Sequence, residues 1–300
     1  IFAQQVESAF HKIFNEFPHV RDFAMTSNQD EIYFTVESYK KEYSYIAYIT
    51  KDNSGKWSKP KVASFSGMYK DLEPFLAPNG LTLYFATNRK DNSPIEVKKD
   101  IDIWYVTRTS LKSNWSEPKN IGSVINTSAN EYYPSVTNTG DLFFTAAYKD
   151  AKGKEDIYVS RYVNGNYQKP VSLSTAVNSE KYEFNAFVAP DESFIIYTSF
   201  GRKGSFGGGD LYISFKNNQN QWMPAENLGA SINSNRIDFC PFLDLNTNTL
   251  YFTSDRSSIQ KSLKNKKNIQ QLQKILKTKA NGLGRMYKVD ISKILNKKRD

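Results

Sequence analysis

The feature that most constrains this chain is a phrase of about eighteen residues that recurs five times. The copies begin near residues 21, 71, 131, 183 and 238, and equivalent positions lie 51, 60, 52 and 55 residues apart. Each copy places a turn rich in Asn, Asp and Gly between two apolar and aromatic runs, which predicts a hairpin. A period near 50 residues with several short strands per unit is typical of a β-propeller.

Two further strand-like runs complete each unit. A third strand is predicted at segments such as 102–106, 156–159 and 210–213, and an outer strand is marked by an aromatic residue and a proline at 57–60, 115–118, 167–170 and 222–224. Proline suits an outer edge, where no neighbouring strand awaits its missing N–H. We therefore expect a five-bladed propeller of four-stranded antiparallel blades, forming a single domain over residues 1–300. The last unit lacks an outer strand, and we expect residues 5–13 to supply it and close the ring.

Composition limits the cellular setting. The sequence has no run of 18 apolar residues, so no transmembrane helix is expected, and its single cysteine, Cys240, excludes an internal disulfide and is expected to be a buried core thiol. The opening residues IFAQQ are similar to the tail of a signal peptide, with Ala3 at the cleavage point. We expect an exported protein, located in the periplasm, at the outer membrane or outside the cell.

The net charge of +9 is concentrated late in the chain. Residues 256–300 hold 14 of the 40 basic residues and two of the 31 acidic ones, so the first 255 residues are slightly acidic. Within this region, residues 257–283 predict a basic helical insertion in the last blade, because Ile269, Leu272 and Leu276 have helical spacing. The helix either packs its apolar side on the last blade or docks on an anionic membrane, an anionic glycan or a partner. Nucleic-acid binding is not expected, because the basic segment lacks aromatic stacking platforms.

Acidic residues introduce four of the five repeats. Asp71, Glu131, Glu183 and Asp238 share one position before the first strand, and fivefold geometry is expected to gather them at the mouth of the central channel. Two residues later the units hold Asp22, Glu73, Tyr133, Asn185 and Cys240, an unequal set beside Arg21. One interpretation is structural: the acids bind backbone N–H groups or pair with Arg89, Arg202 and Arg256. The other is functional: the acids form a negative well for a ligand or for Ca²⁺.

The repeat itself resembles a known family. The stretch EPFLAPNGLTLYFATNR, followed by DIWYV and WSEPKNIG, is similar to the WD40-like repeat of TolB-type β-propellers, especially the stand-alone five-bladed members common in Bacteroidota. The likeness extends from Arg21 to Leu295, although the turns depart from the usual Pro-Asp-Gly. It implies the propeller fold, an exported location and, for many members, a role in protein docking. The box typical of sialidases, Ser-x-Asp-x-Gly-x-Thr-Trp, is absent.

Two functions remain open from the sequence. The first is a monomeric, non-enzymatic module that docks a protein or a glycan at the acidic channel face, with no cofactor other than Ca²⁺. The second is a glycan-active hydrolase or lyase, in which Asp22, Glu73 and Glu183 are candidate catalytic carboxylates. With two histidines, His11 and His19, the chain cannot build a three-histidine zinc site. The candidate ligand-binding residues are Arg21, Asp22, Asp71, Glu73, Glu131, Tyr133, Glu183, Asn185 and Asp238.

Overall fold

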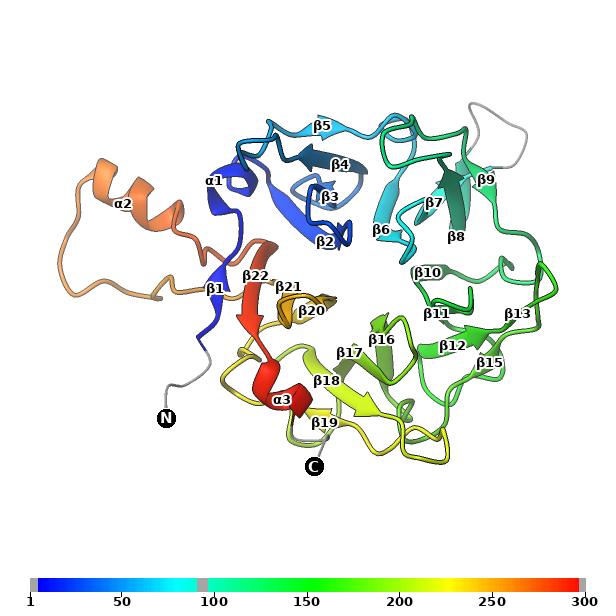
Figure 1. The fold of residues 1–300 in the computed structure, drawn as a ribbon. Helices are drawn as coiled ribbons and strands as arrows, with labels where there is room; N and C mark the ends of the chain where they lie inside the picture. Colours follow the sequence, from blue (N-terminus) through cyan, green and yellow to red (C-terminus); the bar gives the residue numbers. More distant parts are fainter. Residues whose placement is uncertain (1–4, 91–96, 297–300) are drawn as a thin grey trace.

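Five four-stranded antiparallel sheets form a ring around a central axis in the computed structural model (Figure 1). The structure describes residues 5–90 and 97–296. The architecture is a five-bladed β-propeller, which confirms the fold class expected from the repeat. In each blade, three consecutive strands run outward from the channel, and a short fourth strand forms the rim.

The strands of the blades, from the channel outward, have the following bounds. Blade 1 holds β2 (His19–Met25), β3 (Glu31–Glu37), β4 (Ser44–Thr50) and β5 (Lys61–Val62), and blade 2 holds β6 (Asp71–Leu76), β7 (Thr82–Arg89), β8 (Val97–Thr107) and β9 (Lys119–Asn120). Blade 3 holds β10 (Glu131–Val136), β11 (Leu142–Ala146), β12 (Asp156–Ser160) and β15 (Val171–Ser172), with a rim hairpin of β13 (Tyr162–Val163) and β14 (Asn166–Tyr167). Blade 4 holds β16 (Tyr182–Val188), β17 (Phe194–Phe200), β18 (Asp210–Phe215) and β19 (Glu226–Asn227), and blade 5 holds β20 (Asp238–Asp244), β21 (Thr249–Ser254), β22 (Arg285–Asp290) and β1 (Glu7–Ser8).

The outer strand of blade 5 comes from the beginning of the described chain. β1 lies antiparallel to β22, with Glu7 opposite Lys288, and the backbone N–H of Ala9 donates to the carbonyl of Met286. The short helix α1 (His11–Phe14) then leads the chain into blade 1, while α3 (Ser292–Asn296) follows β22. The ring therefore joins its first and last segments within one sheet, which leaves no open seam between blades 1 and 5.

The outer strands are shorter than the sequence pattern predicts. Each of the four in blades 1 to 4 has two residues and begins one or two residues after the proline rather than containing it. In blade 2 an asparagine in the following connection also holds the third strand: Asn126 accepts from the N–H of Ile103 and donates to its carbonyl. Asn178 and Asn233 make the same pair of bonds in blades 3 and 4. The recurrent VIN, AVN and SIN segments thus fix blades 2, 3 and 4 to their connections.

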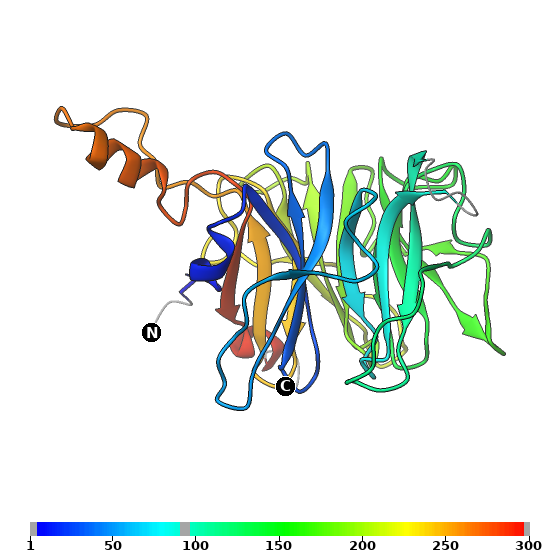
Figure 2. The ribbon, with the colours of Figure 1, turned by 90° about the horizontal axis from the view of Figure 1, so that it is seen from above.

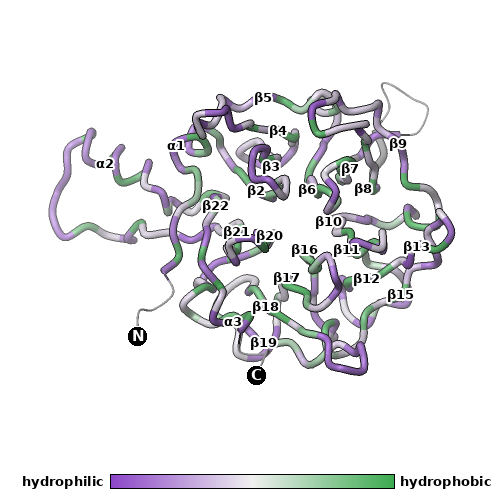
Figure 3. The backbone as a smooth tube through the Cα atoms, in the orientation of Figure 1, coloured by the Kyte–Doolittle hydropathy of each residue, from purple (hydrophilic) through white to green (hydrophobic). Residues whose placement is uncertain are grey.

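Apolar side chains fill the spaces between adjacent blades. Large residues such as Phe34, Phe85, Phe143 and Phe252 are fully buried in these layers, and Figure 3 shows the hydrophobic residues concentrated along the strands. Aromatic and β-branched side chains suit this packing because both faces of every blade are covered. The core consequently forms a closed wall around the channel.

The insertion forms a helix, but the helix does not pack on the propeller. α2 (Ile269–Leu276) begins with a capping box, in which Asn268 accepts from the N–H of Gln271 and the Gln271 side chain accepts from the N–H of Asn268. In Figures 1 and 2 it stands clear of the ring, beyond the rim of blade 5. Ile269 and Leu276 are 65% and 63% exposed. The expectation that this apolar side packs on the last blade is wrong, because the long stem of the insertion carries the helix away from the sheet.

Candidate functional site

The four acids that introduce the repeats lie inside the blades. Asp71, Glu131, Glu183 and Asp238 are all fully buried. Asp71 accepts hydrogen bonds from Thr87 and Arg89, both at 2.7 Å, and from Ser66 at 2.8 Å. These donors come from the second strand and the incoming connection of the same blade. The carboxylate therefore ties the start of the inner strand to its own blade.

Two other acids make equivalent contacts. Glu183 accepts from the N–H and hydroxyl of Ser179 and from Arg202 at 3.0 Å. Asp238 accepts from the N–H of Ser234 and from Arg256 at 2.7 Å. Both acids thus bind a backbone N–H group and an arginine, which are the partners that the structural interpretation of the sequence predicts. A buried carboxylate with both kinds of partner is stabilised in place and offers little to a ligand.

Glu131 differs because blade 3 has no arginine at this point. It accepts from the N–H and hydroxyl of Thr127, at 3.1 and 2.6 Å. The segment after its second strand reads AAYK, and Tyr148 lies beside the carboxyl group. Burial without a full counter-charge raises the pKa of Glu131 to about 7, although the bonds from Thr127 oppose the shift.

The residues two positions further on lie at the centre of the ring. The inner strand of each blade shifts register at this point, and the residue at the shift has a left-handed backbone. These five residues are Asp22, Glu73, Tyr133, Asn185 and Cys240, with φ between 52° and 60°. A left-handed, non-glycine residue costs about 1–2 kcal/mol. Its repetition in all five blades identifies a built-in bulge that turns these residues toward the channel.

The bulge leaves backbone N–H groups that the inner strand cannot satisfy. In three blades a buried threonine of the preceding blade accepts this bond: Thr35 from Glu73, Thr145 from Asn185 and Thr253 from Asp22, at 3.0 to 3.3 Å. In blade 3 the N–H of Tyr133 donates instead to Oε2 of Glu73 at 2.8 Å. The contacts between blades at the centre are therefore specific hydrogen bonds as well as apolar packing.

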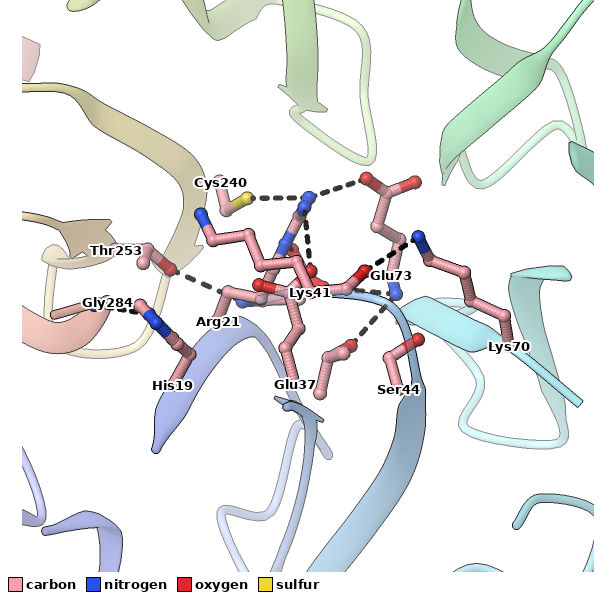
Figure 4. A network of polar contacts seen from close by, with 12 residues as sticks. His19, Arg21, Glu37, Lys41, Ser44, Lys70, Glu73, Cys240, Thr253 and Gly284 are labelled. Carbon is pink, nitrogen blue, oxygen red and sulfur yellow. Dashed lines mark hydrogen bonds and ion pairs between the residues drawn. The ribbon is translucent and has the colours of Figure 1, made fainter. Parts of the chain in front are cut away.

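Arg21 connects these residues across the channel (Figure 4). Its guanidinium donates to Asp22 Oδ1 at 3.0 Å, to Glu73 Oε1 at 2.6 Å and to Cys240 Sγ at 3.4 Å, and its Nη1 lies 3.8 Å from Glu37 Oε1. We call Arg21, Asp22, Glu37, Glu73, Tyr133 and Cys240 the hub network. It joins blades 1, 2, 3 and 5, since Tyr133 also donates its hydroxyl to the carbonyl of Pro241 at 3.1 Å.

Charge in the hub network is unbalanced toward acid. Burial raises the pKa of Glu73, Arg21 opposes the shift, and the neighbouring carboxylates of Asp22 and Glu37 add to it. Burial likewise raises the pKa of the Cys240 thiol, and Cys240 is buried as the sequence indicated. Lys41 and Lys70 lie beside the network, where the Lys70 ammonium donates to the carbonyl of Lys41 (Figure 4).

Blade 4 contributes an incomplete contact to the hub. Asn185 is 3% exposed, and within the described part of the chain its amide nitrogen Nδ2 has no hydrogen-bond partner. The hub network shares Tyr133 and Cys240 with an apolar cluster that also contains Tyr132, Phe184 and Phe239. The Arg21 guanidinium lies 5.3 Å from the centroid of the Phe239 ring, so charged and aromatic side chains are in contact at the centre of the ring. Of the predicted ligand-binding residues, Arg21 keeps the largest accessible side chain in this network, at 15% exposure.

The two mouths of the channel differ. We call the face at which the inner strands begin the upper face; register places the connections 38–43, 63–70 and 201–209 there. Exposed Tyr39, Met68 and Phe206 lie on these connections, at 73%, 71% and 47%. At the lower face, a cavity of about 170 Å³ is lined by apolar residues that include Phe75 and Phe187.

Some of these residues were not found from the sequence. Glu37, Thr35 and Thr253 lie on the second strands of their blades. The residue pattern of those strands predicts that they belong to a blade, but it does not predict their contacts at the centre of the ring. The recurrent threonine in YFTV, YFAT, FFTA, IYTS and YFTS is the signal that was available. Ca²⁺ coordination gains no support, because residues 5–90 and 97–296 contain no group of three or more His, Cys, Asp or Glu placed to hold a metal ion.

Similarity to known proteins is confined to the fold. No protein-family model and no curated protein matches the sequence. The chain is similar to BT0996 in its solved complex with RGII, at 9% identity over 90% of this protein and 86% of the matched one, with a TM-score of 0.56. It is also similar to the catalytic domain of a GH62 α-L-arabinofuranosidase of Coprinopsis cinerea, at 12% identity over 96% of both proteins, with a TM-score of 0.55.

TolB of Acinetobacter baumannii is among the similar structures. The identity is 13% over 91% of this chain and 54% of TolB, with a TM-score of 0.48, so the chain spans about half the length of TolB. The feature shared with BT0996 and the arabinofuranosidase domain is the propeller fold. At such identities the ligand must be argued from the site itself. None of the helices in the described part of the chain has the length and apolarity that a membrane span requires.

Proposed function

We propose that the protein is an exported docking module that binds a macromolecular ligand at the upper face, around the channel mouth. The ligand class is a protein or a glycan, and a protein is favoured by the apolar character of the exposed side chains. Location in the periplasm, at the outer membrane or outside the cell belongs to the same proposal.

One observation carries this proposal. The carboxylates near the channel are engaged within the protein, whereas Tyr39, Met68 and Phe206 on upper-face connections are exposed to solvent. Large exposed apolar side chains are typical of interaction surfaces, and aromatic residues and methionine are enriched in them. The rigid blades hold these connections in fixed positions, which lowers the entropy cost of binding.

The hydrolase alternative is less well supported by the same geometry. A glycosidase needs one protonated and one ionised carboxyl group that both reach the substrate. Glu73 accepts from Arg21 and from the N–H of Tyr133, and Asp22 accepts from Arg21 and from the N–H of Glu73. Both side chains are almost fully buried, at 3% and 2% exposure. Catalysis by this pair would require the hub network to open.

The experiment compares upper-face and lower-face variants. Purified wild-type protein is screened against a polysaccharide panel and against envelope proteins, and each ligand found is titrated with Tyr39→Ala/Met68→Ala. Its matched control is Tyr162→Ala/Leu245→Ala, which removes side chains of 43% and 45% exposure away from the upper face. We expect at least about a tenfold loss of affinity for the first variant and little change for the control, since interface anchors contribute more than about 1 kcal/mol each.

Two results would contradict the proposal. One is equal binding by the upper-face variant and the wild type for every ligand found. The other is turnover of a polysaccharide that Glu73→Gln abolishes while binding persists, because that result would support the hydrolase.

A further inference from the structure

The insertion of residues 257–283 presents an apolar surface that the protein itself does not cover. α2, all of which is described, contains no buried residue, and it projects beyond the rim of blade 5 (Figures 1 and 2). Ile269, Leu272 and Leu276 are 65%, 40% and 63% exposed. Three large aliphatic side chains on a two-turn helix in water are unfavourable unless another surface receives them.

The exposed residues share one side of the helix. Their spacing of i, i+3 and i+7 places them within one stripe. A different side, with Gln271, Lys274 and Ile275, faces the stem of the insertion and lines a cavity of about 390 Å³ with Ser258 and Ile259. The apolar stripe is therefore directed away from the protein's own chain.

The stem fixes where the helix stands. Ser257 and Asn281 form an antiparallel bridge, and the N–H of Ser258 donates to the carbonyl of Ala280 at 2.9 Å. The hydroxyl of Tyr287 on β22 donates to the carbonyl of Lys279 at 3.3 Å. The helix is thus presented at the rim of the upper face by a base that is bonded to blade 5.

The insertion and the rest of the molecule differ in net charge. Residues 257–283 contain seven lysines and no acidic residue, whereas residues 1–255 contain 26 basic and 29 acidic residues. An anionic surface attracts the insertion and weakly repels the body of the propeller. Such a surface would therefore engage the insertion first.

We propose that the insertion docks the protein on an anionic lipid bilayer. Ile269, Leu272 and Leu276 enter the boundary between head groups and acyl chains, while the flanking lysines contact lipid phosphates. A soluble polyanion would engage the lysines and leave the apolar stripe in water, so the combination favours a membrane surface. This inference goes beyond the proposed docking of a ligand at the channel mouth and does not depend on it.

The test measures sedimentation of the full chain with vesicles of phosphatidylcholine, with and without an equal part of phosphatidylglycerol. We expect binding to the anionic vesicles, weakened by salt. Ile269→Gln/Leu272→Gln/Leu276→Gln is expected to lower the partition coefficient at least about tenfold, because apolar burial contributes to interfacial binding. The matched control is Val62→Gln/Val171→Gln, which changes exposed side chains on the outer strands β5 and β15.

The lysines are tested in the same assay. Lys266→Gln/Lys277→Gln is expected to lower the partition coefficient about fivefold for each lysine removed. Lys59→Gln/Lys112→Gln, on exposed connections at the lower face, is expected to leave it unchanged. None of the insertion substitutions touches a blade, so unchanged thermal unfolding verifies the fold.

Three outcomes would overturn the proposal. They are absence of binding to the anionic vesicles, binding that the triple glutamine substitution does not weaken, and binding to soluble dextran sulfate without binding to the anionic vesicles. The last outcome would assign the insertion to a polyanionic glycan instead of a bilayer.

Discussion

Removing the guanidinium of Arg21 is the sharpest test of the hub network. In Arg21→Leu, the carboxylates of Asp22 and Glu73 lose their ion pairs of 3.0 and 2.6 Å while remaining almost fully buried. Breaking a buried pair by removing one partner costs about 3–5 kcal/mol, because the remaining charge is uncompensated. For a chain of this size, such a loss lowers Tm by about 6–10 °C.

The measurement is thermal and urea unfolding of matched variants. Arg161→Leu is the control, since Arg161 pairs with Asp141 and Glu192 but its side chain is 44% exposed. Exposed pairs contribute about 1 kcal/mol or less. Arg21→Leu/Glu73→Gln is expected to recover part of the loss, because glutamine still accepts from Tyr133 and carries no charge.

The Arg21→Leu variant also has a predicted pH dependence. Burial already raises the pKa of Glu73, and the variant lacks the cation that opposes this shift. A carboxyl group with a raised folded-state pKa stabilises the fold at low pH, and this stabilisation is lost as pH rises through that pKa. The deficit relative to wild type should therefore be smaller near pH 5 than near pH 8. A loss below about 1 kcal/mol, or one that neither Glu73→Gln nor acid relieves, would refute this account of the hub.

Three further predictions concern the blades. Because the pKa of Glu131 is raised to about 7, its contribution to stability should fall by about 2 kcal/mol as pH rises from 4.5 to 7, and the difference in stability between the wild type and Glu131→Gln should change by that amount in urea titrations. Gly207→Ala should lower Tm by several degrees, since a Cβ would lie 2.1 Å from a backbone oxygen, whereas Gly208→Ala, with 3.9 Å of space, should not. Thr253→Val should cost about 1–2 kcal/mol in urea unfolding, because the buried N–H of Asp22 loses its acceptor; an unchanged midpoint would contradict this assignment.

Gly207 and Gly208 show that the composition of a segment does not reveal which of its residues pack against distant parts of the chain. Both belong to the stretch GRKGSFGGGD, whose composition alone indicates a flexible loop. In the structure Gly207 packs against the connection at 234–236, and Gly153 packs equivalently against residues 179–181. That contact joins segments about thirty residues apart, so composition could not distinguish the constrained glycine from its neighbour.

The sequence by itself determined the architecture. Repeat length, the alternation within each run, and the turn residues are local properties, and five copies of one unit can bury their faces only against each other. The acids Asp71, Glu183 and Asp238 and their arginine partners also lie within one unit, so the structural interpretation was available for each of them from the repeat alone.

Only the tertiary structure decided the centre of the ring and the fate of the insertion. Arg21 meets Glu73 and Cys240 across 52 and 219 residues, and a left-handed bulge in every inner strand turns these groups toward one another. Helical spacing predicted α2 but not the surface that it faces, because an apolar stripe is the same whether it packs on a blade or lies in solvent. Contacts between distant segments, and the distance at which the stem of the insertion holds α2 from the blades, depend on the folded chain. No single repeat encodes them.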